Sequence, residues 1–161
     1  MKKITPFLWF DNQAEEAVNF YTSIFDNSEV LSVSRYSEAG PGPAGSVMTI
    51  AFRLGDQEFV ALNGGPVYHF TPAISLSVDC KNQEEVDRLW ERFSADGGEP
   101  VQCGWITDKY GLSWQIIPTR LLELISDPDP EISKRVMEAM IKMVKIDLAA
   151  IEAAYRGEAV A

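Results

Sequence analysis

An internal repeat constrains the fold of this chain more than any other feature. ITPFLWFDNQAEEAVNFY begins at Ile4, and TPAISLSVDCKNQEEVDRLW begins at Thr71. Each copy reads as a short alternating strand, an Asn-Gln pair near a helix start, a Glu-Glu pair, and apolar residues at helical spacing. The acidic pairs fall in the first helical turns, where the helix dipole favours negative charge. The repeat predicts a duplicated strand–helix unit.

Further strands are expected behind each predicted helix. Alternating or β-branched runs place them at 29–36, 46–54 and 58–63 in the first half, and at 100–107 and 112–118 in the second. Turn residues at 55–57 and 109–111 separate neighbouring strands. Each half therefore reads as βαβββ or close to it, which predicts an α+β fold.

The chain after Thr119 changes to a helical pattern. A short helix is expected at 121–125, a break at the prolines of 127–130, and helix from 131 to about 155 with an interruption near 145–147. An apolar stripe in this region comprises Met137, Met140, Ile141 and Val144. Such a stripe packs against a core or a partner subunit more often than it binds a cofactor.

A length of 161 residues supports one principal domain and at most a small second unit. We assign that domain to residues 1–120, with modules at about 3–65 and 70–120, and a C-terminal helical extension to 121–161. The Gly- and Pro-rich stretch 40–45 is expected to be an exposed, mobile loop. A connector is the favoured interpretation of this loop, with a lid as the alternative.

Composition and charge exclude several classes of partner. The formal charge is −10, the sequence pI is about 4.5, and the 14 basic residues form no cluster, which argues against nucleic acid. No apolar run is long enough for a membrane helix, and the residues after Met1-Lys2-Lys3 lack a signal-peptide core, so a cytoplasmic protein without a membrane partner is expected. Cys80 and Cys103 are expected to be reduced structural thiols, in preference to a disulfide or a reactive nucleophile.

Strand alternation predicts which side chains face inward. Ser75 and Ser77 alternate with bulky residues that should pack on a helix, and Ser113, Gln115 and Ile117 share one face of the last strand. In the first half the inner set is expected to be Phe7 and Trp9 on one strand, with Phe59, Ala61 and Asn63 on another. The candidate ligand-binding residues are Phe7, Trp9, Phe59, Asn63, Ser75, Ser77, Trp105, Ser113 and Gln115.

Three motifs carry a resemblance to a known family: PFLWFDNQAEEAVNFY, AISLSVDCKNQEEVDRLW and CGWITDKYGLSWQIIP. The chain resembles the PhnB-like group, also called the demethylubiquinone methyltransferase domain, of the vicinal oxygen chelate superfamily, which includes glyoxalases, bleomycin-resistance proteins and extradiol dioxygenases. The likeness covers about residues 3–120. It implies two paired βαβββ modules that form a curved, cup-like mixed sheet, and a homodimer. The C-terminal helices also fit the longer members of the group.

The resemblance further implies where a metal would bind. In the superfamily, four inner-face positions commonly hold a divalent ion through His and Glu, and they fall here at Phe7, Ala61, Ala73 and Gln115. The first three cannot ligate a metal, and the neutral amide of Gln115 is a poor ligand. We therefore expect neither a metal nor another cofactor.

Other chemically interesting residues have ordinary interpretations. His69, the only histidine, is expected to pack or to donate a hydrogen bond, with a role as ligand or general base as the alternative. Asp11 and Asp108 flank turns and are expected to bond to backbone rather than to form a catalytic pair. The 64–66 stretch Gly-Gly-Pro lacks the pattern of a nucleotide-binding loop, so methyl transfer has no support beyond the family name.

Three functions remain open from the sequence. The first is a small-molecule binding protein, or a metal-independent enzyme of unassigned reaction, with an aromatic and amide-lined cup. The second is a metal-dependent enzyme of the glyoxalase or dioxygenase type, which rests on fold analogy alone. The third is an interaction protein whose C-terminal helices build an oligomer.

Overall fold

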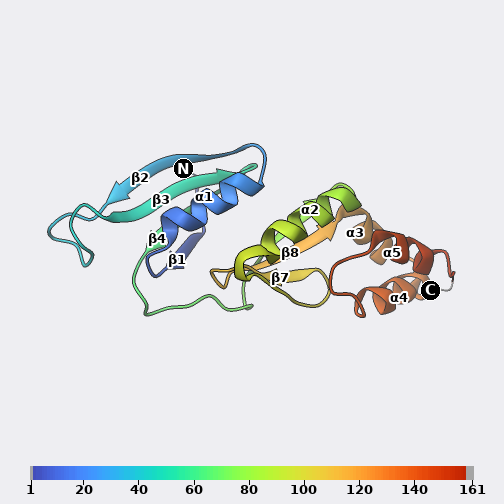
Figure 1. The fold of residues 1–161 in the computed structure, drawn as a ribbon. Helices are drawn as coiled ribbons and strands as arrows, with labels where there is room; N and C mark the ends of the chain where they lie inside the picture. The colour runs from blue at the N-terminus through green and yellow to red at the C-terminus, as the bar shows by residue number, and fades with distance from the viewer. Residues whose placement is uncertain (1, 159–161) are drawn as a thin grey trace. The chain divides into compact units, whose positions relative to one another are not determined.

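A computed structural model describes residues 2–158 of the chain. Contacts between residues divide the chain into two compact units, Met1–Phe70 and Thr71–Ala161. The first unit runs from blue to green in Figure 1, and the second from green to red. Each unit repeats the same order of strands and helix, so the duplication predicted from the sequence is present.

The first unit is a βαβββ module. Its elements are β1 (Phe7–Phe10), α1 (Ala14–Ile24), β2 (Ser28–Arg35), β3 (Val47–Leu54) and β4 (Gln57–Asn63). The sheet has the order β1-β4-β3-β2, with β1 parallel to β4 and the other pairs antiparallel. One face of α1 is fully buried, through Ala14, Ala17, Val18, Tyr21 and Ile24. This helix therefore covers one face of the sheet, and the opposite face does not contact α1.

The second unit begins with the same module. Its elements are β5 (Ser75–Cys80), α2 (Gln83–Ser94), the 3₁₀ turn η1 (Ala95–Gly97), β6 (Glu99–Pro100), β7 (Trp105–Thr107) and β8 (Ser113–Pro118). The sheet order is β5-β8-β7-β6, with β5 parallel to β8. The α+β fold and the two βαβββ modules predicted from the sequence are confirmed, each module with its own four-stranded mixed sheet.

The C-terminal extension consists of α3 (Thr119–Ile125), α4 (Pro130–Met140) and α5 (Leu148–Tyr155). The helical region expected over 131–155 is two helices, and the break between them is longer than the interruption expected near 145–147. The chain leaves helical geometry after Met140 and restarts at Leu148, where Asp147 accepts a hydrogen bond from Ala150 N. The core of the extension comprises Ile117, Leu121, Leu124, Val136, Ile146 and Ile151. Since Ile117 belongs to β8, the helices pack onto the end of the second sheet.

Backbone and side-chain bonds attach this extension to the second module. The predicted strand 100–107 is interrupted at Cys103 and Gly104, which both have positive φ and donate to Met143 O and Val144 O at 2.8 Å each. Gln83, at the start of α2, donates to Ile146 O at 2.9 Å and accepts from Leu148 N at 2.7 Å. The interruption in the strand therefore serves to hold the α4–α5 connection.

The repeated Asn-Gln pair has a different role in each module. In the second module Asn82 is the helix N-cap and accepts from Glu85 N at 2.9 Å. In the first module the N-cap is Gln13, whose side chain makes no capping bond, and Asn63 from β4 accepts from Ala14 N at 2.9 Å instead. The first helix is therefore capped from a strand, across 49 residues of sequence.

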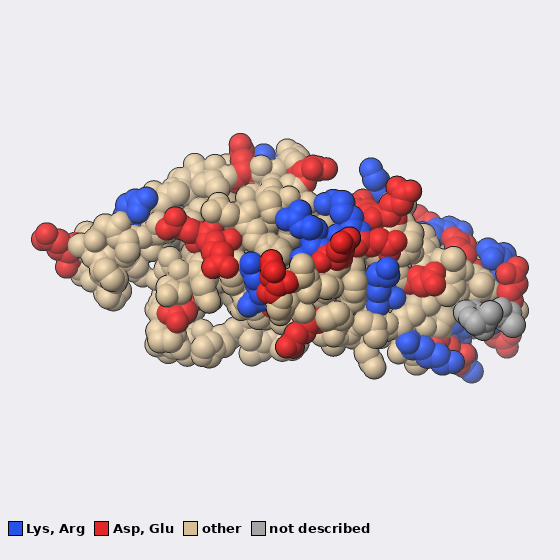
Figure 2. All heavy atoms as spheres, in the orientation of Figure 1, with Lys and Arg blue, Asp and Glu red and all other residues tan. Residues whose placement is uncertain are grey.

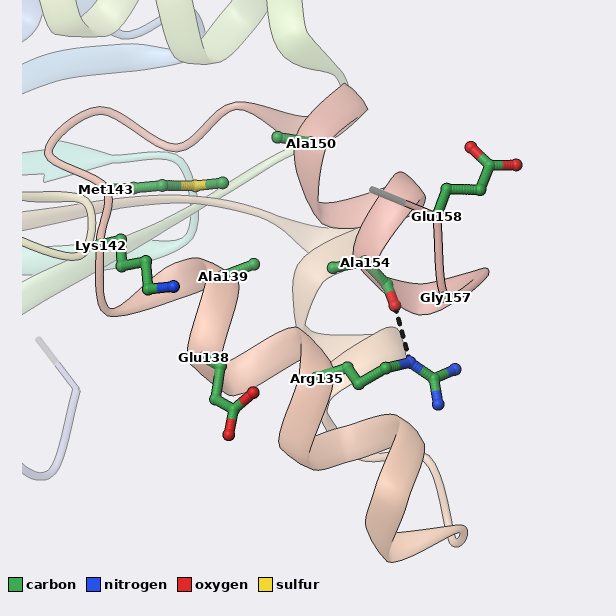
Figure 3. Close-up of a pocket in the computed structure, with 9 residues that line it drawn as sticks. All are labelled: Arg135, Glu138, Ala139, Lys142, Met143, Ala150, Ala154, Gly157 and Glu158. Atoms are coloured by element: carbon green, nitrogen blue, oxygen red, sulfur yellow. Dashed lines mark hydrogen bonds between the residues drawn. The ribbon is translucent and has the colours of Figure 1, made fainter. Parts of the chain in front are cut away.

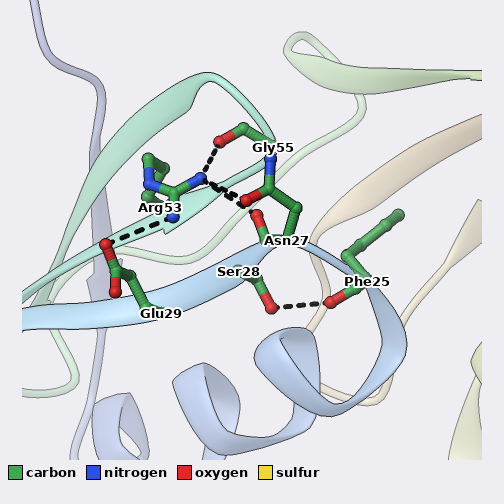
Figure 4. Close-up of polar contacts among 6 residues, drawn as sticks. All are labelled: Phe25, Asn27, Ser28, Glu29, Arg53 and Gly55. Atoms are coloured by element: carbon green, nitrogen blue, oxygen red, sulfur yellow. Dashed lines mark hydrogen bonds and ion pairs between the residues drawn. The ribbon is translucent and has the colours of Figure 1, made fainter.

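A polar cluster ties the end of α1 to the β3–β4 turn (Figure 4). Arg53 donates to the carbonyl oxygens of Asn27 and Gly55 and forms an ion pair with Glu29 at 3.2 Å. Asn27 has a φ of 53°, which an asparagine tolerates better than most residues. Ser28 Oγ closes the helix end by donating to Phe25 O at 2.6 Å. These bonds lie away from the inward-facing residues predicted from the sequence.

The surface carries the mixture of acidic and basic side chains that the composition predicts. On the face seen in Figure 2, basic side chains are interspersed with acidic ones and do not form a continuous basic surface. Within residues 2–158, no helix is both long enough and apolar enough to cross a membrane.

Candidate functional site

One face of the second sheet carries the polar residues predicted for the site. Ser75 pairs with Ser113 and Ser77 with Gln115 across β5 and β8, and Trp105 pairs with Gln115 across β7 and β8. Residues that are directly paired across strands point to the same face. These five predicted residues therefore share one face, as the alternation of the sequence indicated.

The opposite face of this sheet packs against α2. Trp114 is 2% exposed, and its ring lies 4.8 Å from that of Phe93 on α2. Ile116 is fully buried on the same side. The face with Gln115 is thus the one that α2 does not cover.

Gln115 and Ser75 form the polar centre of the uncovered face. Gln115 Nε2 donates to Ser75 Oγ at 2.9 Å. Gln115 Oε1 and the Ser75 hydroxyl hydrogen remain for a ligand, so the pair offers one acceptor and one donor. Trp105 is half-buried beside them, Ser77 is exposed, and Ser113 is nearly inaccessible at 2%.

In the first sheet, the predicted inner set does not lie on one face. The register pairs Phe7 with Val60, and Phe10 with Asn63. Asn63 therefore shares a face with Phe10, on the side of α1, and so does Phe59, which alternates with Val60. The expectation that Phe59 and Asn63 lie on the face of Phe7 and Trp9 is wrong.

The positions of Phe59 and Asn63 explain what they do instead. Phe59 is 5% exposed and stacks on Phe52, with ring centroids 5.4 Å apart, so it belongs to the core. Asn63 uses both ends of its amide, since it accepts from Ala14 N and donates to Val47 O at 3.2 Å. Both side chains are occupied by the fold.

Phe7 and Trp9 do share the face away from α1, but their surroundings differ. Phe7 is 60% exposed. Trp9 donates from Nε1 to Gly65 O at 2.8 Å and meets Tyr68 edge to face at 5.0 Å. A Cβ on Gly64 would lie only 2.4 Å from the Trp9 ring, so the loop after β4 lies directly on this tryptophan. Phe7 is the more accessible of the two.

The residues at the superfamily's metal positions do not fit a divalent ion. Ala61 lies on the α1 side, because it pairs with Leu8, and Ala73 lies in the turn before β5. The β4 residues that do share the face of Phe7 are Glu58, Val60 and Leu62; of these only Glu58 has ligand atoms, and its Oε2 accepts from Lys2 N at 3.2 Å. Within residues 2–158 no group of three or more His, Cys, Asp or Glu side chains is arranged to hold a metal. The donor set around Gln115 is amide, hydroxyl and indole.

Asp108 is a structural carboxylate. It is 3% exposed, and its Oδ1 accepts from Tyr110 N at 2.9 Å and Leu112 N at 3.0 Å, while Oδ2 accepts from Trp114 Nε1 at 2.9 Å. The predicted backbone-bonding role is confirmed for this residue. His69 is exposed in the loop between β4 and β5.

Both cysteines are free thiols. Cys80 is fully buried, and burial, followed by the nearby charge of Glu85, raises the pKa of its thiol to about 12. A thiol with this pKa stays protonated near neutral pH, so Cys80 is a structural residue and not a nucleophile.

The first unit contains a pocket that the sequence did not predict. A pocket of about 430 Å³ is lined by the middle of the Gly- and Pro-rich loop, at Pro41, Gly42 and Pro43, and by Tyr36 and Asp11. The loop folds around Tyr36, since a Cβ on Gly42 would lie 2.4 Å from the tyrosine ring, and Tyr36 Oη donates to Asn63 O. The glycine at position 42 could have indicated this packing from the sequence, because a larger residue would not fit against the Tyr36 ring.

Comparison with known proteins agrees with the module architecture. The profile of the family described as 3-demethylubiquinone-9 3-methyltransferase matches residues 2–117. A solved structure of a PhnB protein from Bacillus cereus, described as a putative 3-demethylubiquinone-9 3-methyltransferase, is 43% identical with a TM-score of 0.66. The match covers 73% of this chain and 99% of that one.

Two further solved structures are similar. A protein from Staphylococcus aureus is 33% identical over 73% of this chain and 97% of its own, with a TM-score of 0.34. A protein from Pseudomonas aeruginosa is 20% identical over 71% of this chain and 95% of its own, and its TM-score of 0.58 shows a shared fold. No curated protein sequence matches the chain. The family match over 2–117 and the identity with the Bacillus cereus protein together show that this chain belongs to the PhnB-like family, described as 3-demethylubiquinone-9 3-methyltransferase.

Proposed function

We propose that the chain binds a small molecule with a planar polar group on the uncovered face of the second sheet, without a metal. The observation that carries this proposal is the hydrogen bond between Gln115 Nε2 and Ser75 Oγ beside Trp105. The bond fixes the amide, so that its oxygen and the serine hydroxyl present an acceptor and a donor side by side. An indole adjacent to such a pair provides a stacking surface for a planar ligand.

The chemistry of the candidate residues favours binding over proton transfer. Ser75, Ser77, Trp105, Ser113 and Gln115 include no side chain that titrates near neutral pH, and general acid–base catalysis needs such a group. Whether a reaction follows binding depends on the ligand's own chemistry. Exposed Phe7, on the uncovered face of the first sheet, is the candidate from that module.

Titration of planar amides and catechols, followed by tryptophan fluorescence, tests the proposal. We expect nicotinamide, uracil or catechol to change the fluorescence, and Trp105→Phe to remove the change. Trp90→Phe is the matched control, because Trp90 lies on α2. Gln115→Leu should weaken binding by about tenfold, the effect of losing one or two hydrogen bonds. Absence of a response to every probe, or a response unchanged by both site variants, would contradict the proposal.

Two alternatives have distinct signatures. A metal-dependent glyoxalase- or dioxygenase-type enzyme would bind Zn²⁺, Mn²⁺ or Fe²⁺ stoichiometrically, with affinity lost in Gln115→Leu. A methyltransferase, as the family description suggests, would bind S-adenosylmethionine. Against the latter, Gly64-Gly65 leads through a loop to β5 and not into a helix, whereas nucleotide-binding loops open a helix.

We also propose that the protein forms a homodimer, as expected from the resemblance, with a cytoplasmic location. Support for an interface comes from the extension, where Met137, Ile141 and Val144 are 43%, 51% and 46% exposed. Met140, predicted in the same stripe, instead packs against the core of the extension. Large apolar side chains exposed together mark interaction surfaces more often than isolated ones do.

A further inference from the structure

An open pocket of about 480 Å³ lies between α4 and α5, in the part of the chain beyond the family match. Its apolar lining consists of Ala139, Met143, Ala150 and Ala154. Figure 3 shows Arg135 and Glu138 on α4, and Lys142 in the connection that follows. The three alanines leave volume that larger side chains would fill, and a methionine adapts to the shape of an apolar ligand. The pocket is not part of the site around Gln115.

Arg135 is held in place by the end of α5. Gly157, with a φ of 75°, donates to Ala154 O at 3.1 Å, and Glu158 N donates to Ala153 O at 2.9 Å, which is the Schellman pattern. Arg135 Nε then donates to Ala154 O at 3.0 Å and Nη2 to Tyr155 O at 2.9 Å. Both Nη1 N–H groups and one on Nη2 have no partner within residues 2–158. A guanidinium fixed in this way is already ordered before a ligand arrives.

The charged residues that line the pocket are two bases, Arg135 and Lys142, and two acids, Glu138 and Glu158. Glu138 forms an ion pair with Lys134 at 3.8 Å, and Glu158 pairs with Arg156 at 3.0 Å, so both acids are matched by bases that do not line the pocket. Lys142 is exposed and has no ion-pair partner in the described part of the chain. Arg135 and Lys142 therefore line the pocket without ion-pair partners among the described residues.

We infer that the pocket between α4 and α5 binds a small amphipathic monocarboxylate. The carboxylate is placed at the free N–H groups of Arg135, because a guanidinium fork matches carboxylate geometry. Lys142 lies at the other end of the pocket in Figure 3 and contributes long-range attraction only. The apolar body of the ligand lies against Met143, Ala150 and Ala154. Inorganic anions lack an apolar chain that the lining could bury, and neutral lipids lack an anionic group to bind Arg135.

Titration calorimetry with octanoate tests this inference, with octanamide and acetate as partial ligands. We expect octanoate to bind saturably at submillimolar to millimolar concentration, and octanamide and acetate to bind at least about tenfold more weakly. Binding should weaken as salt rises, since the cationic groups are partly exposed. Octanamide binding as tightly as octanoate, or no octanoate binding up to about 10 mM, overturns the inference.

Variants that preserve the fold locate the binding. Ala150→Leu fills the pocket and should abolish octanoate binding, whereas Ala149→Leu, an exposed neighbour on α5, should leave it unchanged. Lys142→Gln should weaken binding about threefold to tenfold, and Lys81→Gln, the same charge change outside the pocket, should not. Gln115→Leu should also have no effect, which separates this site from the one proposed above. Octanoate affinity that is equal in Ala150→Leu and Ala149→Leu places the ligand elsewhere and overturns the inference.

Discussion

At the scale of single residues, hydrogen bonds to the carboxylate oxygens of Asp108 hold the turn in the family motif at 103–118. Three donors converge on this buried carboxylate: two backbone N–H groups and the indole of Trp114. An amide at this position has only one acceptor oxygen, so it would direct an NH₂ group at another donor. The aspartate thus joins the β7–β8 turn to the buried tryptophan beneath the candidate site.

Asp108→Asn should lower the free energy of unfolding by about 1–3 kcal/mol, the cost of an unsatisfied buried donor. In a Trp114→Phe background, where the indole donor is absent, most of that cost should disappear. Urea unfolding of the two single variants and the double variant measures this coupling. Equal costs of Asp108→Asn in both backgrounds would show that the indole contact is energetically irrelevant.

At the scale of elements, the attachment of the extension depends on the first turns of α2. Gln83 binds Ile146 O and Leu148 N where the α4–α5 connection meets α5, and Lys145 forms an ion pair with Asp87 at 2.8 Å. The hydrogen bond from Lys145, then that from Gln83, lowers the pKa of the Asp87 carboxyl below 3.8. A folded-state pKa below the unfolded value contributes stability above the unfolded value, and this contribution is lost as pH falls through the folded one.

Asp87→Asn should therefore destabilise the protein at pH 7, and the effect should shrink as pH falls below 3.8 through the folded-state pKa. Because half of the Asp87 side chain is exposed, the difference at pH 7 should stay below about 1 kcal/mol. Urea unfolding of both proteins at pH 7, at about pH 3 and at still lower pH gives the comparison, with Glu84→Gln as the control on the same helix. A gap between wild type and Asp87→Asn that is as large at pH 3 as at pH 7 and does not shrink at still lower pH would rule out this ion pair as its source.

Elements also explain which parts of the site were predictable. In β5, serines alternate with Leu76 and Val78, so the inward face was evident and the register confirmed it. In β4, Phe59, Val60 and Ala61 are all at most 5% exposed, so the strand is buried on both sides and its alternation carries no information about facing. Helix boundaries in the extension and both pockets depend on contacts between distant segments, which local pattern does not encode.

At the scale of the whole molecule, the second of the two βαβββ modules is followed by a helical extension, and the first is not. The PhnB protein from Bacillus cereus is covered almost entirely by 73% of this chain, and the family match ends at residue 117, before the three C-terminal helices begin. These helices carry the exposed residues Met137, Ile141 and Val144. The proposed interface on the extension is therefore one that this chain need not share with shorter family members.

Ile141→Lys should convert a homodimer into a species with the monomer mass of 17.9 kDa, because a lysine cannot be buried in an apolar interface without a partner. Light scattering after size exclusion, over about 5–100 µM protein, gives the masses. Ile4→Lys, which alters an 83% exposed residue in the first unit, should leave the dimer intact. A monomeric wild-type protein, or a dimer unaffected by Ile141→Lys, contradicts the proposed interface.

The hydrogen bonds that connect Gln83, Cys103 and Gly104 with the α4–α5 connection have a consequence for protein engineering. Because of these bonds, residues 71–158 should be exchanged between related proteins as one unit. The extension needs its own α2 and its own 103–104 loop to keep its hydrogen bonds. Residues 2–70 make none of these bonds. A chimera that takes its first module from a shorter relative and its second module from this chain therefore keeps every one of them, whereas the reverse chimera loses the bonds that hold the extension in place.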